Sequence, residues 1–459
     1  MGNRPTNEDT ISALSTPPGI GGIAVVRLSG PNSLNIVNKL LPKSKSLSNK
    51  SHRMATVATI IDPNTGDILD DAVITFFRGP DSYTSEDLVE ISCHGGHYVQ
   101  AKLLEILTGL GSRIADPGEF TKRAFLGGKL DLSQAEAVAD LIAAKVEKSH
   151  KSSILQMRGS LKAEVTDLRN KLVELSALIE AELDFSDEEI SLTPNSKITE
   201  LINSLADKTN TILGNYKFGK IIREGAVIPI VGKPNAGKSS LLNAILDTER
   251  AIVTPIPGTT RDTLEEEVDI GGYLVQLIDT AGVHISDDSI EKLGVERSLS
   301  VIEAADLIIW LLDRSAPISD DDLELMALLR GKNVIAVESK TDVDRHSEFT
   351  PMERNIDIDI SLSSHTGEGL KALMGAIIEK LETMDHGEPL LITNARQAAA
   401  LKKGAESLKE ALKSARDSAS GELIAVDLRN AMNYLGEITG EITTDDVLNE
   451  IFGRFCIGK

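Results

Sequence analysis

Hydrophobic and polar positions change their period several times along the chain, and each change indicates a different kind of structure. Up to about residue 125, short runs of β-branched and aromatic residues alternate with turn residues. These runs are Ile23–Leu28, Ala55–Ile61, Ala72–Phe77 and Leu88–Ser92. With a helix expected over about 97–110, the pattern predicts an α+β fold. Alternation in the last run would place Val89, Ile91 and Cys93 on one face and Glu90 on the other.

From about residue 126 the apolar spacing becomes helical. A first set of apolar residues recurs every three or four positions: Val165, Leu168, Leu172, Leu175 and Ile179. A second set lies near the end of the chain: Leu401, Leu408, Leu412, Leu428, Met432 and Leu435. Stripes of this kind are typical of helices that face a core. Because residues 222–382 alternate strand and helix patterns, we predict an all-α domain (126–221 and 383–459) with an α/β domain inserted into it.

The inserted domain opens on an apolar run, Ala226–Val231, followed by Gly232–Ser239 (GKPNAGKS) and a helical pattern. A strand, a Gly-rich turn and a helix in this order predict a P-loop. Its backbone N–H groups curl around phosphate oxygens, Lys238 places a charge between the β- and γ-phosphates, and the Ser239 hydroxyl can bind Mg²⁺. The P-loop residues expected to contact the nucleotide are Asn235, Ala236, Gly237, Lys238, Ser239 and Ser240.

Two further signals downstream indicate a GTPase switch domain. Asp279–Gly282 (DTAG) ends an apolar run and puts a carboxylate where a contact to Mg²⁺ is expected. Between it and the P-loop, a hydroxyl such as that of Thr260 can complete the Mg²⁺ shell. The next residue is Val283, where Ras-like proteins carry the glutamine that orients the attacking water. Hydrolysis therefore needs another water-positioning group and another positive charge.

The segment expected to read the base is Ser339–Asp342 (SKTD), where G proteins usually have Asn-Lys-x-Asp. Asp342 can accept two hydrogen bonds from guanine, whereas adenine would present an acceptor to it, so guanine is favoured. Ser339 lacks the amide that normally ties this loop to the P-loop and to guanine N7, which predicts modest affinity. The residues expected at the base are Ser339, Lys340, Thr341, Asp342, Ser363, Ser364 and His365.

Composition narrows the class of protein. A length of 459 residues predicts about three domains. The net charge of −22 argues against a broad electrostatic grip on nucleic acid, so any RNA contact would be local or shared with a partner. No apolar run approaches a membrane span and no signal peptide is evident, and two cysteines are too few for a disulfide framework. We therefore expect a soluble, cytoplasmic protein that does not bind membranes.

Several short motifs occur together in a fixed order. They are Thr16–Gly22 followed by Arg27, Pro117–Phe120 followed by Arg123–Phe125, Lys129–Ala137, and Phe455–Lys459 (FCIGK). In this order they closely resemble the MnmE (TrmE) family of tRNA-modification GTPases, and the resemblance covers nearly the whole chain.

The resemblance implies a function for the N-terminal residues 1–125. They would form a tetrahydrofolate-binding-like domain that holds a 5-formyl- or methylene-tetrahydrofolate and mediates homodimerisation. Motif position implies folate contacts from Arg27, Glu90, Lys129 and Lys459, although simple surface exposure is the alternative for Glu90. Family members work with an FAD-containing MnmG (GidA)-type partner, in a heterotetramer, to install an aminomethyl-type group on C5 of the wobble uridine of certain tRNAs.

The resemblance also supplies what Val283 lacks. It implies a K⁺ ion held by Asn235, Thr254, Ile256 and Thr259, whose charge would offset that of the β–γ bridge. The nucleotide contacts implied outside the P-loop are Thr254, Pro255, Ile256, Pro257, Gly258, Thr259, Thr260, Asp279, Thr280, Ala281 and Gly282. Counting back from Gly294–Arg297 assigns the water-orienting acid to Glu291, with an exposed helical glutamate as the alternative.

Cys456 lies in the tail that the resemblance places beside the folate domain. It is a candidate for the modification chemistry, and a small packed hydrophobe is the alternative. Two other functions for the whole chain stay open. One is a ribosome- or RNA-assembly GTPase of the Era or Der type, which would carry a basic RNA-binding domain instead of the folate-like N-terminus. The other is a regulatory switch with no role in modification.

Overall fold

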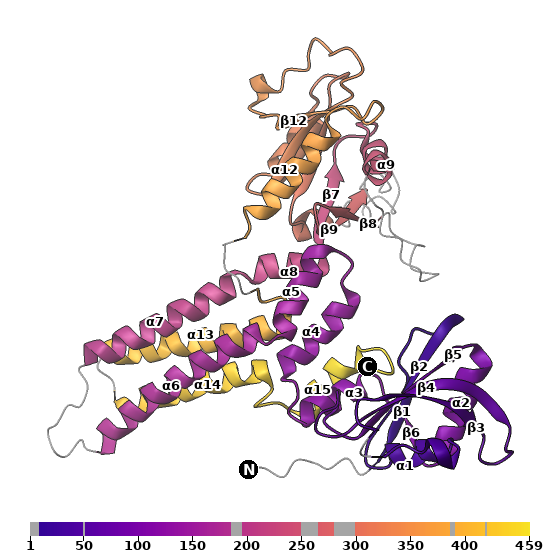
Figure 1. Cartoon of the computed structure of the whole chain (residues 1–459). Helices are drawn as coiled ribbons and strands as arrows, with labels where there is room; N and C mark the ends of the chain where they lie inside the picture. Colours follow the sequence, from indigo (N-terminus) through magenta and orange to yellow (C-terminus); the bar gives the residue numbers. More distant parts are fainter. Residues whose placement is uncertain are drawn as a thin grey trace, which may run out of the picture. The chain divides into compact units, whose positions relative to one another are not determined.

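The structure is a computed structural model that describes residues 9–48, 51–184, 195–248, 265–279, 299–385, 391–417 and 420–459. Figure 1 shows the chain coloured along its sequence. The chain divides into two compact units. The first comprises Met1–Ala139, Met157–Arg169 and Leu435–Lys459, and the second comprises Asp140–Gln156 and Asn170–Tyr434. The domain bounds expected from the sequence differ from this division and stay a prediction.

The first unit is built on a six-stranded sheet of order β3-β4-β5-β2-β1-β6. Its strands are β1 (Ile11–Leu14), β2 (Gly21–Ser29), β3 (Ala55–Ile61), β4 (Ile68–Phe77), β5 (Leu88–Gly95) and β6 (Arg113–Ile114). Its helices are α1 (Ser33–Asn38), the short η1 (Lys43–Lys45), α2 (His97–Gly109), α3 (Glu119–Leu126), most of α4 (Leu132–Ala143) and α15 (Asp445–Gly453). The four predicted strands and the predicted helix are present, and β1 and β6 are two strands that the pattern did not reveal.

The two faces of this sheet differ in burial. One face carries the core, in which side chains from β2, β4 and β5 pack with those of α1 and α2. Val89, Ile91 and Cys93 belong to this core, whereas Glu90 is half-buried on the opposite face, as the alternation predicts. The opposite face exposes apolar side chains, among them Val57 and its cross-strand partner Val73.

Long helices make up much of the rest of the chain. They are α5 (Glu147–Met157), α6 (Ser160–Asp184), α7 (Asn195–Gly214), α8 (Tyr216–Glu224), α13 (Ala395–Arg416) and α14 (Gly421–Thr439). In Figure 1, α7 and α13 run side by side, which agrees with their extensive contact. The predicted apolar stripe of α6, from Val165 to Ile179, is buried. Among the described residues, no helix is long and apolar enough to cross a membrane.

Between α8 and α13 lies an α/β domain with a six-stranded sheet of order β12-β11-β10-β7-β9-β8. Its strands are β7 (Ala226–Val231), β8 (Glu265–Ile270), β9 (Tyr273–Asp279), β10 (Ile308–Asp313), β11 (Val334–Ser339) and β12 (Ile360–Ser361). Its helices are α9 (Lys238–Thr248), α11 (Asp320–Leu328), the short η5 (Met352–Arg354) and α12 (Leu370–Glu382). Among the strands that the structure describes here, only β8 runs antiparallel to its neighbour.

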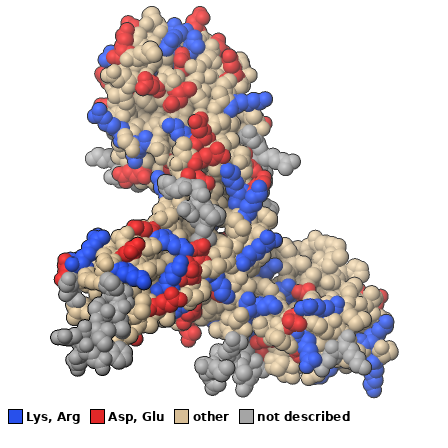
Figure 2. Space-filling view, turned by 60° about the vertical axis from the view of Figure 1, so that its left-hand side comes forward, with Lys and Arg blue, Asp and Glu red and all other residues tan. Residues whose placement is uncertain are grey.

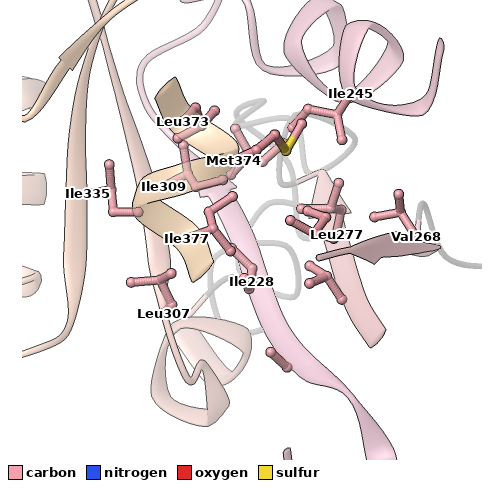
Figure 3. Packing of buried hydrophobic residues seen from close by; sticks show 14 of the residues in the cluster. Ile228, Ile245, Val268, Leu277, Leu307, Ile309, Ile335, Leu373, Met374 and Ile377 are labelled. Atoms are coloured by element: carbon pink, nitrogen blue, oxygen red, sulfur yellow. The ribbon is translucent and has the colours of Figure 1, made fainter. Parts of the chain in front are cut away.

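Figure 3 shows the core of this inserted domain, where α12 lays Leu373 and Ile377 against the central strands. Because all neighbouring strands except β8 run parallel, the carboxyl ends of β7, β9, β10 and β11 lie along one edge, which is where ligands bind in such sheets. The predicted fold class is confirmed: an α+β N-terminal domain, a helical domain and an inserted α/β P-loop domain.

Candidate nucleotide site and N-terminal ligand site

The turn between β7 and α9 has the backbone that a phosphate-binding loop needs. Gly232 and Gly237 adopt φ of 154° and 99°, and Asn235 adopts 63°, a value uncommon for a residue with a side chain. A Cβ on Gly232 would lie 2.6 Å from the Leu311 carbonyl oxygen, so a larger residue does not fit there. α9 begins at Lys238, and its first N–H groups and its dipole point toward the turn.

The side chains expected to bind phosphate and Mg²⁺ meet in this turn. The Lys238 ammonium is buried and donates to the carbonyl oxygens of Gly232 (2.8 Å) and Lys233 (3.0 Å). Burial lowers the pKa of Lys238, and the nearby carboxylate of Asp279 opposes this shift. The Ser239 hydroxyl donates to Asp279 Oδ2 at 2.5 Å, so the P-loop and the end of β9 converge on one point. That pair is the arrangement a Mg²⁺ site of this class uses.

The base-reading loop contacts the P-loop through Ser339. The Ser339 hydroxyl is buried and lies 2.9 Å from the carbonyl oxygen of Ala236, to which it donates, and 3.2 Å from that of Leu312. The loop is therefore still tied to the P-loop despite the missing amide, whereas the modest nucleotide affinity expected from Ser339 stays a prediction. A short hydroxyl replaces the amide because β11 carries Ser339 close to the P-loop backbone.

Asp342 is held in place by the loop that follows β12. The buried Ser363 hydroxyl donates to Asp342 Oδ1 at 2.6 Å and accepts from the amides of His365 and Thr366. The hydrogen bond from Ser363 lowers the pKa of Asp342, which keeps this exposed carboxylate ionised. The two loops expected to contact guanine are thus brought together, and Asp342 stays the predicted acceptor for the base.

Part of the predicted site falls outside the described residues. These positions are Thr254, Pro255, Ile256, Pro257, Gly258, Thr259, Thr260, Thr280, Ala281, Gly282 and Glu291. Asn235, the remaining member of the predicted K⁺ set, is exposed on the P-loop. In the part of the chain that is described, no cluster of three or more His, Cys, Asp or Glu residues is arranged to hold a metal ion.

The predicted folate contacts Arg27 and Glu90 form a cross-strand pair in the first unit. They face each other in the β2–β5 register, and the Arg27 guanidinium donates twice to Glu90 Oε1, at 3.0 and 2.6 Å. The guanidinium also lies over the rings of Tyr83 (5.5 Å) and Phe120 (5.7 Å). The ion pair between Arg27 and Glu90 therefore packs against two aromatic rings.

The chain's last residues dock beside this pair. The Phe120 amide donates to the Lys459 carbonyl (3.2 Å), and the Ser15 hydroxyl donates to the Gly458 carbonyl (3.0 Å). Lys129 is exposed in the turn after α3. In the part of the chain that is described, no side-chain hydrogen bond or ion pair joins Lys129 or Lys459 to Arg27 and Glu90.

Cys456 belongs to this docked tail, and its backbone carbonyl accepts from the Gly118 amide at 3.4 Å. Its side chain is nevertheless exposed. The alternative that Cys456 is a packed hydrophobe is therefore wrong, because the backbone holds the tail and leaves the thiol outside.

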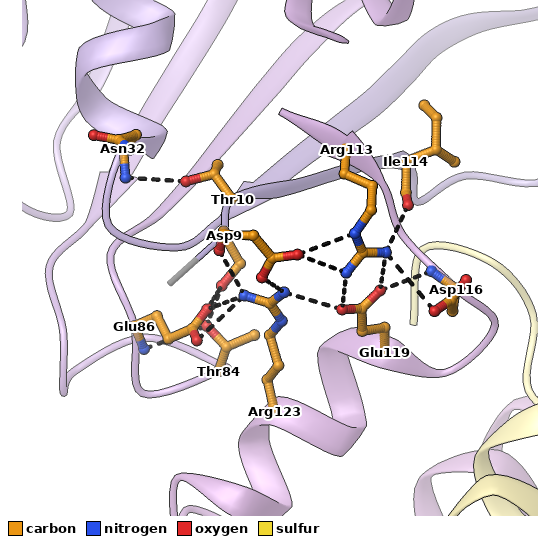
Figure 4. A network of polar contacts seen from close by, with 11 residues as sticks. Asp9, Thr10, Asn32, Thr84, Glu86, Arg113, Ile114, Asp116, Glu119 and Arg123 are labelled. Atoms are coloured by element: carbon orange, nitrogen blue, oxygen red, sulfur yellow. Dashed lines mark hydrogen bonds and ion pairs between the residues drawn. The ribbon is translucent and has the colours of Figure 1, made fainter. Parts of the chain in front are cut away.

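Arg123 is the residue whose importance sequence reasoning missed. Its guanidinium, 1% exposed, bonds Asp9, Glu86 and Glu119, and Figure 4 shows Arg113 joining Asp9 and Glu119 from the other side. The motif around Arg123 was recognised, but nothing in the local sequence reveals partners that lie up to 114 residues away.

Charge on the surface agrees with the acidic composition. Figure 2 shows basic and acidic side chains intermingled on the face in view, without a broad basic surface on the described residues there. How the chain contacts RNA stays a prediction from its composition.

The inserted fold and the P-loop define a P-loop protein, and the position of Asp342 is the one expected of a GTPase. Comparison with known proteins extends this class to a family. Residues 132–456 match the MnmE helical domain, and residues 10–129 match the GTP-binding protein TrmE N-terminus. The chain therefore belongs to the MnmE (TrmE) family.

Named relatives agree with this. The chain is 42% identical to the tRNA modification GTPase MnmE of Natranaerobius thermophilus, covering 98% of this chain and all of that protein. It is also 42% identical to the MnmE of Geotalea uraniireducens, covering 98% and 99%. Among solved structures, Aquifex aeolicus Era bound to GDP and aluminium fluoride is 27% identical over 39% of this chain and 65% of its own, with a TM-score of 0.28. The Era or Der type of assembly factor is not favoured, because the family match includes the N-terminus.

Proposed function

We propose that this GTPase modifies tRNA. With an FAD-containing partner of the MnmG type, it installs an aminomethyl-type group on C5 of the wobble uridine of certain tRNAs. The carbon comes from a 5-formyl- or methylene-tetrahydrofolate bound at the N-terminal site, and GTP hydrolysis, stimulated by K⁺, accompanies the reaction. We place this activity in the cytoplasm.

One observation supports this proposal: the described residues form two candidate ligand sites of different chemistry. The nucleotide site has Lys238, Ser239 and Asp279 at the edge of a parallel sheet. The N-terminal site has Arg27 and Glu90 on another sheet, beside a docked tail with an exposed thiol. A switch that only timed an assembly would need the first site alone, whereas a modifying enzyme needs a place for the group it transfers.

The N-terminal residues fit a folate. Both hydrogen bonds from Arg27 go to Glu90 Oε1, so Oε2 of the partly exposed carboxylate can accept from the N–H groups of a pterin ring. The rings of Tyr83 and Phe120 provide a wall on which a flat ring can pack. The bound folate would supply a one-carbon unit. Arg27 orients Glu90 through its two hydrogen bonds, and Lys129 and Lys459 would offer cations to the ligand's glutamate tail.

The nucleotide site fits Mg²⁺ and K⁺. The Ser239 hydroxyl beside Asp279 suits Mg²⁺, with Thr260 as the proposed second hydroxyl. Asn235 presents its amide from a positive-φ position at the rim of the P-loop, where an oxygen ligand for K⁺ is needed. The cation would supply positive charge at the β–γ bridge, and Glu291 is the proposed group that orients water.

The proposed homodimer uses the open face of the N-terminal sheet. Ile23, Val57 and Val73 are exposed on this face, which also carries Arg27 and Glu90. Exposed apolar side chains on one sheet face favour association. Light scattering of Val57→Lys tests this, with Val426→Lys at another exposed valine, on α14, as the control, because only Val57→Lys should yield monomers.

The modification itself is tested by nucleoside analysis of tRNA from a strain that lacks the gene. Wild type should restore the wobble nucleoside, Lys238→Ala and Glu90→Gln should not, and Glu105→Gln, which changes an exposed carboxylate on α2, should. Glu90→Gln should retain GTP hydrolysis, which separates the two sites. Full restoration by both Lys238→Ala and Glu90→Gln would refute the proposal.

The role of K⁺ is tested by comparing GTP hydrolysis in K⁺ and Na⁺. We expect faster hydrolysis in K⁺, and a loss of roughly 10²–10³ in rate for Asn235→Ala, the usual cost of removing one charge-stabilising group. Equal rates in both salts would remove the cation from the mechanism.

A further inference from the structure

Lysines from both nucleotide-binding loops reach the same short segment, the connection between β10 and α11. The first is Lys340 of the base-reading loop, whose backbone adopts a positive φ of 62°. Its ammonium donates to Asp313 Oδ2 at 2.7 Å. Asp313 ends β10 and is 6% exposed, and its other oxygen accepts from the amide and the hydroxyl of Ser315. The carboxylate is therefore held on both sides.

The second lysine is Lys233 of the P-loop. Its ammonium, on a side chain 14% exposed, donates to the Pro317 carbonyl at 2.9 Å and to Asp322 Oδ2 at 3.2 Å. Asp322 is 1% exposed in the first turn of α11, where the same oxygen accepts from the amide and the hydroxyl of Ser319. The stretch 313–322, which runs from the last residue of β10 into the first turn of α11, therefore carries at each end a fixed, buried carboxylate that pairs with a lysine from a ligand-binding loop.

We propose that residues 313–322 form a brace that holds the base-reading loop and the P-loop in their binding positions, with Asp313 and Asp322 as positioning residues. Neither carboxylate touches the nucleotide in this role. Asp313 acts through Lys340 on the loop that carries Asp342. Asp322 acts through Lys233 on the loop that surrounds the phosphates.

The physical reason is that a flexible lysine fixes a loop only when its charge has a rigid partner. A lysine loses much rotamer freedom on pairing, and exposed pairs gain little. Here the acceptors are buried and bound by backbone amides, so the geometry is set before a ligand arrives. Preorganised loops bind more tightly because less ordering remains to be done on binding.

The two ends of the brace predict different effects. The base-reading loop contacts guanine, so Asp313→Asn should narrow the preference for GDP over IDP, whose base lacks the 2-amino group that Asp342 recognises. The P-loop contacts phosphates whatever the base, so Asp322→Asn should weaken GDP and IDP equally. The GDP/IDP preference of Asp313→Asn and both affinities of Asp322→Asn should fall roughly tenfold, which is the effect of one hydrogen bond to a charged group.

The experiment measures the affinities of the full chain for GDP and IDP, in wild type and in both variants. Asp321→Asn is the control, since it removes the same charge from the exposed neighbour of Asp322. Unfolding followed by Trp310 fluorescence checks that the domain is folded. If an asparagine variant does not fold, Asp313→Glu or Asp322→Glu displaces the carboxylate with its charge intact, and the same effects are expected.

A narrowed GDP/IDP ratio for Asp313→Asn, with equal losses for Asp322→Asn, supports the brace. Wild-type affinities in both variants, or an equal loss for GDP and IDP in Asp313→Asn, overturn it. This inference rests on the proposed base contact of Asp342, so Asp342→Asn belongs in the same assay. If Asp342→Asn keeps the guanine preference, the base contact fails, whereas if it loses the preference and Asp313→Asn does not, only the brace fails.

Discussion

Replacing Arg123 with methionine should strongly lower the stability of the N-terminal unit, although Arg123 is not among the proposed ligand contacts. The substitution keeps an unbranched apolar stem but removes the guanidinium that joins Asp9, Glu86 and Glu119 (Figure 4). Three carboxylates would then face each other with Arg113 as the only cation of the described network left between two of them.

The magnitude follows from burial. Removing one partner of a fully buried ion pair costs about 3–5 kcal/mol. The side chain of Asp9 is 47% exposed and keeps Arg113, so part of the loss is screened, and we expect about 2–3 kcal/mol. For a unit of this size, each kcal/mol lowers the melting temperature by about 2–4 °C. Arg123→Lys should lower the stability by less than Arg123→Met, because lysine keeps the positive charge although it lacks the several N–H donors of the guanidinium.

The assay compares the perturbed N-terminal unit with the other unit, which serves as an internal reference. Amide hydrogen exchange of β1 should accelerate in Arg123→Met, because β1 packs in the cluster beside Arg123. Unfolding followed by the fluorescence of Trp310, the chain's single tryptophan, should not change, since Trp310 lies in the other unit. Lys122→Met, on the same turn of α3, is the matched control. Wild-type exchange of β1 in Arg123→Met would refute the reasoning.

Four further predictions follow from the sites. Burial raises the pKa of Asp9 and Glu119, but hydrogen bonds from Arg113 and Arg123 outweigh this effect, so both pKa values are lowered from 3.8 and 4.5. The stability that these carboxylates contribute is present above those values and should be lost as the pH falls below about 4. Hydrogen exchange of β1 during an acid titration would measure this loss. Ser339→Ala should weaken GDP binding about tenfold while Ser339→Thr does not, measured by titration. Cys456→Ser should hydrolyse GTP normally but modify tRNA poorly; full modification would exclude the thiol. Glu291→Ala should lower kcat at unchanged nucleotide affinity, and the reverse pattern would contradict its role.

The sequence predicted correctly those features that depend on residues close together in the chain. The strand–turn–helix of the P-loop, the alternation that turns Glu90 away from Cys93, and the apolar stripe of α6 all depend on neighbours within a few residues. Period and turn chemistry act over that range, so the fold class and most strands were predictable. The short strands β1 and β6 were not, because they exist only by pairing with each other and with β2.

Tertiary structure decided what depends on residues far apart in the sequence. Ser339 lacks the amide that normally ties the base-reading loop to the P-loop, yet the fold brings its hydroxyl to the Ala236 carbonyl, 103 residues away. Cys456 was ambiguous until the docking of the tail showed its thiol exposed. Arg123 and its three carboxylates, like the two lysines that reach residues 313–322, are ordinary charges in the sequence. Burial and geometry give these pairs their strength, and only the assembled fold determines both.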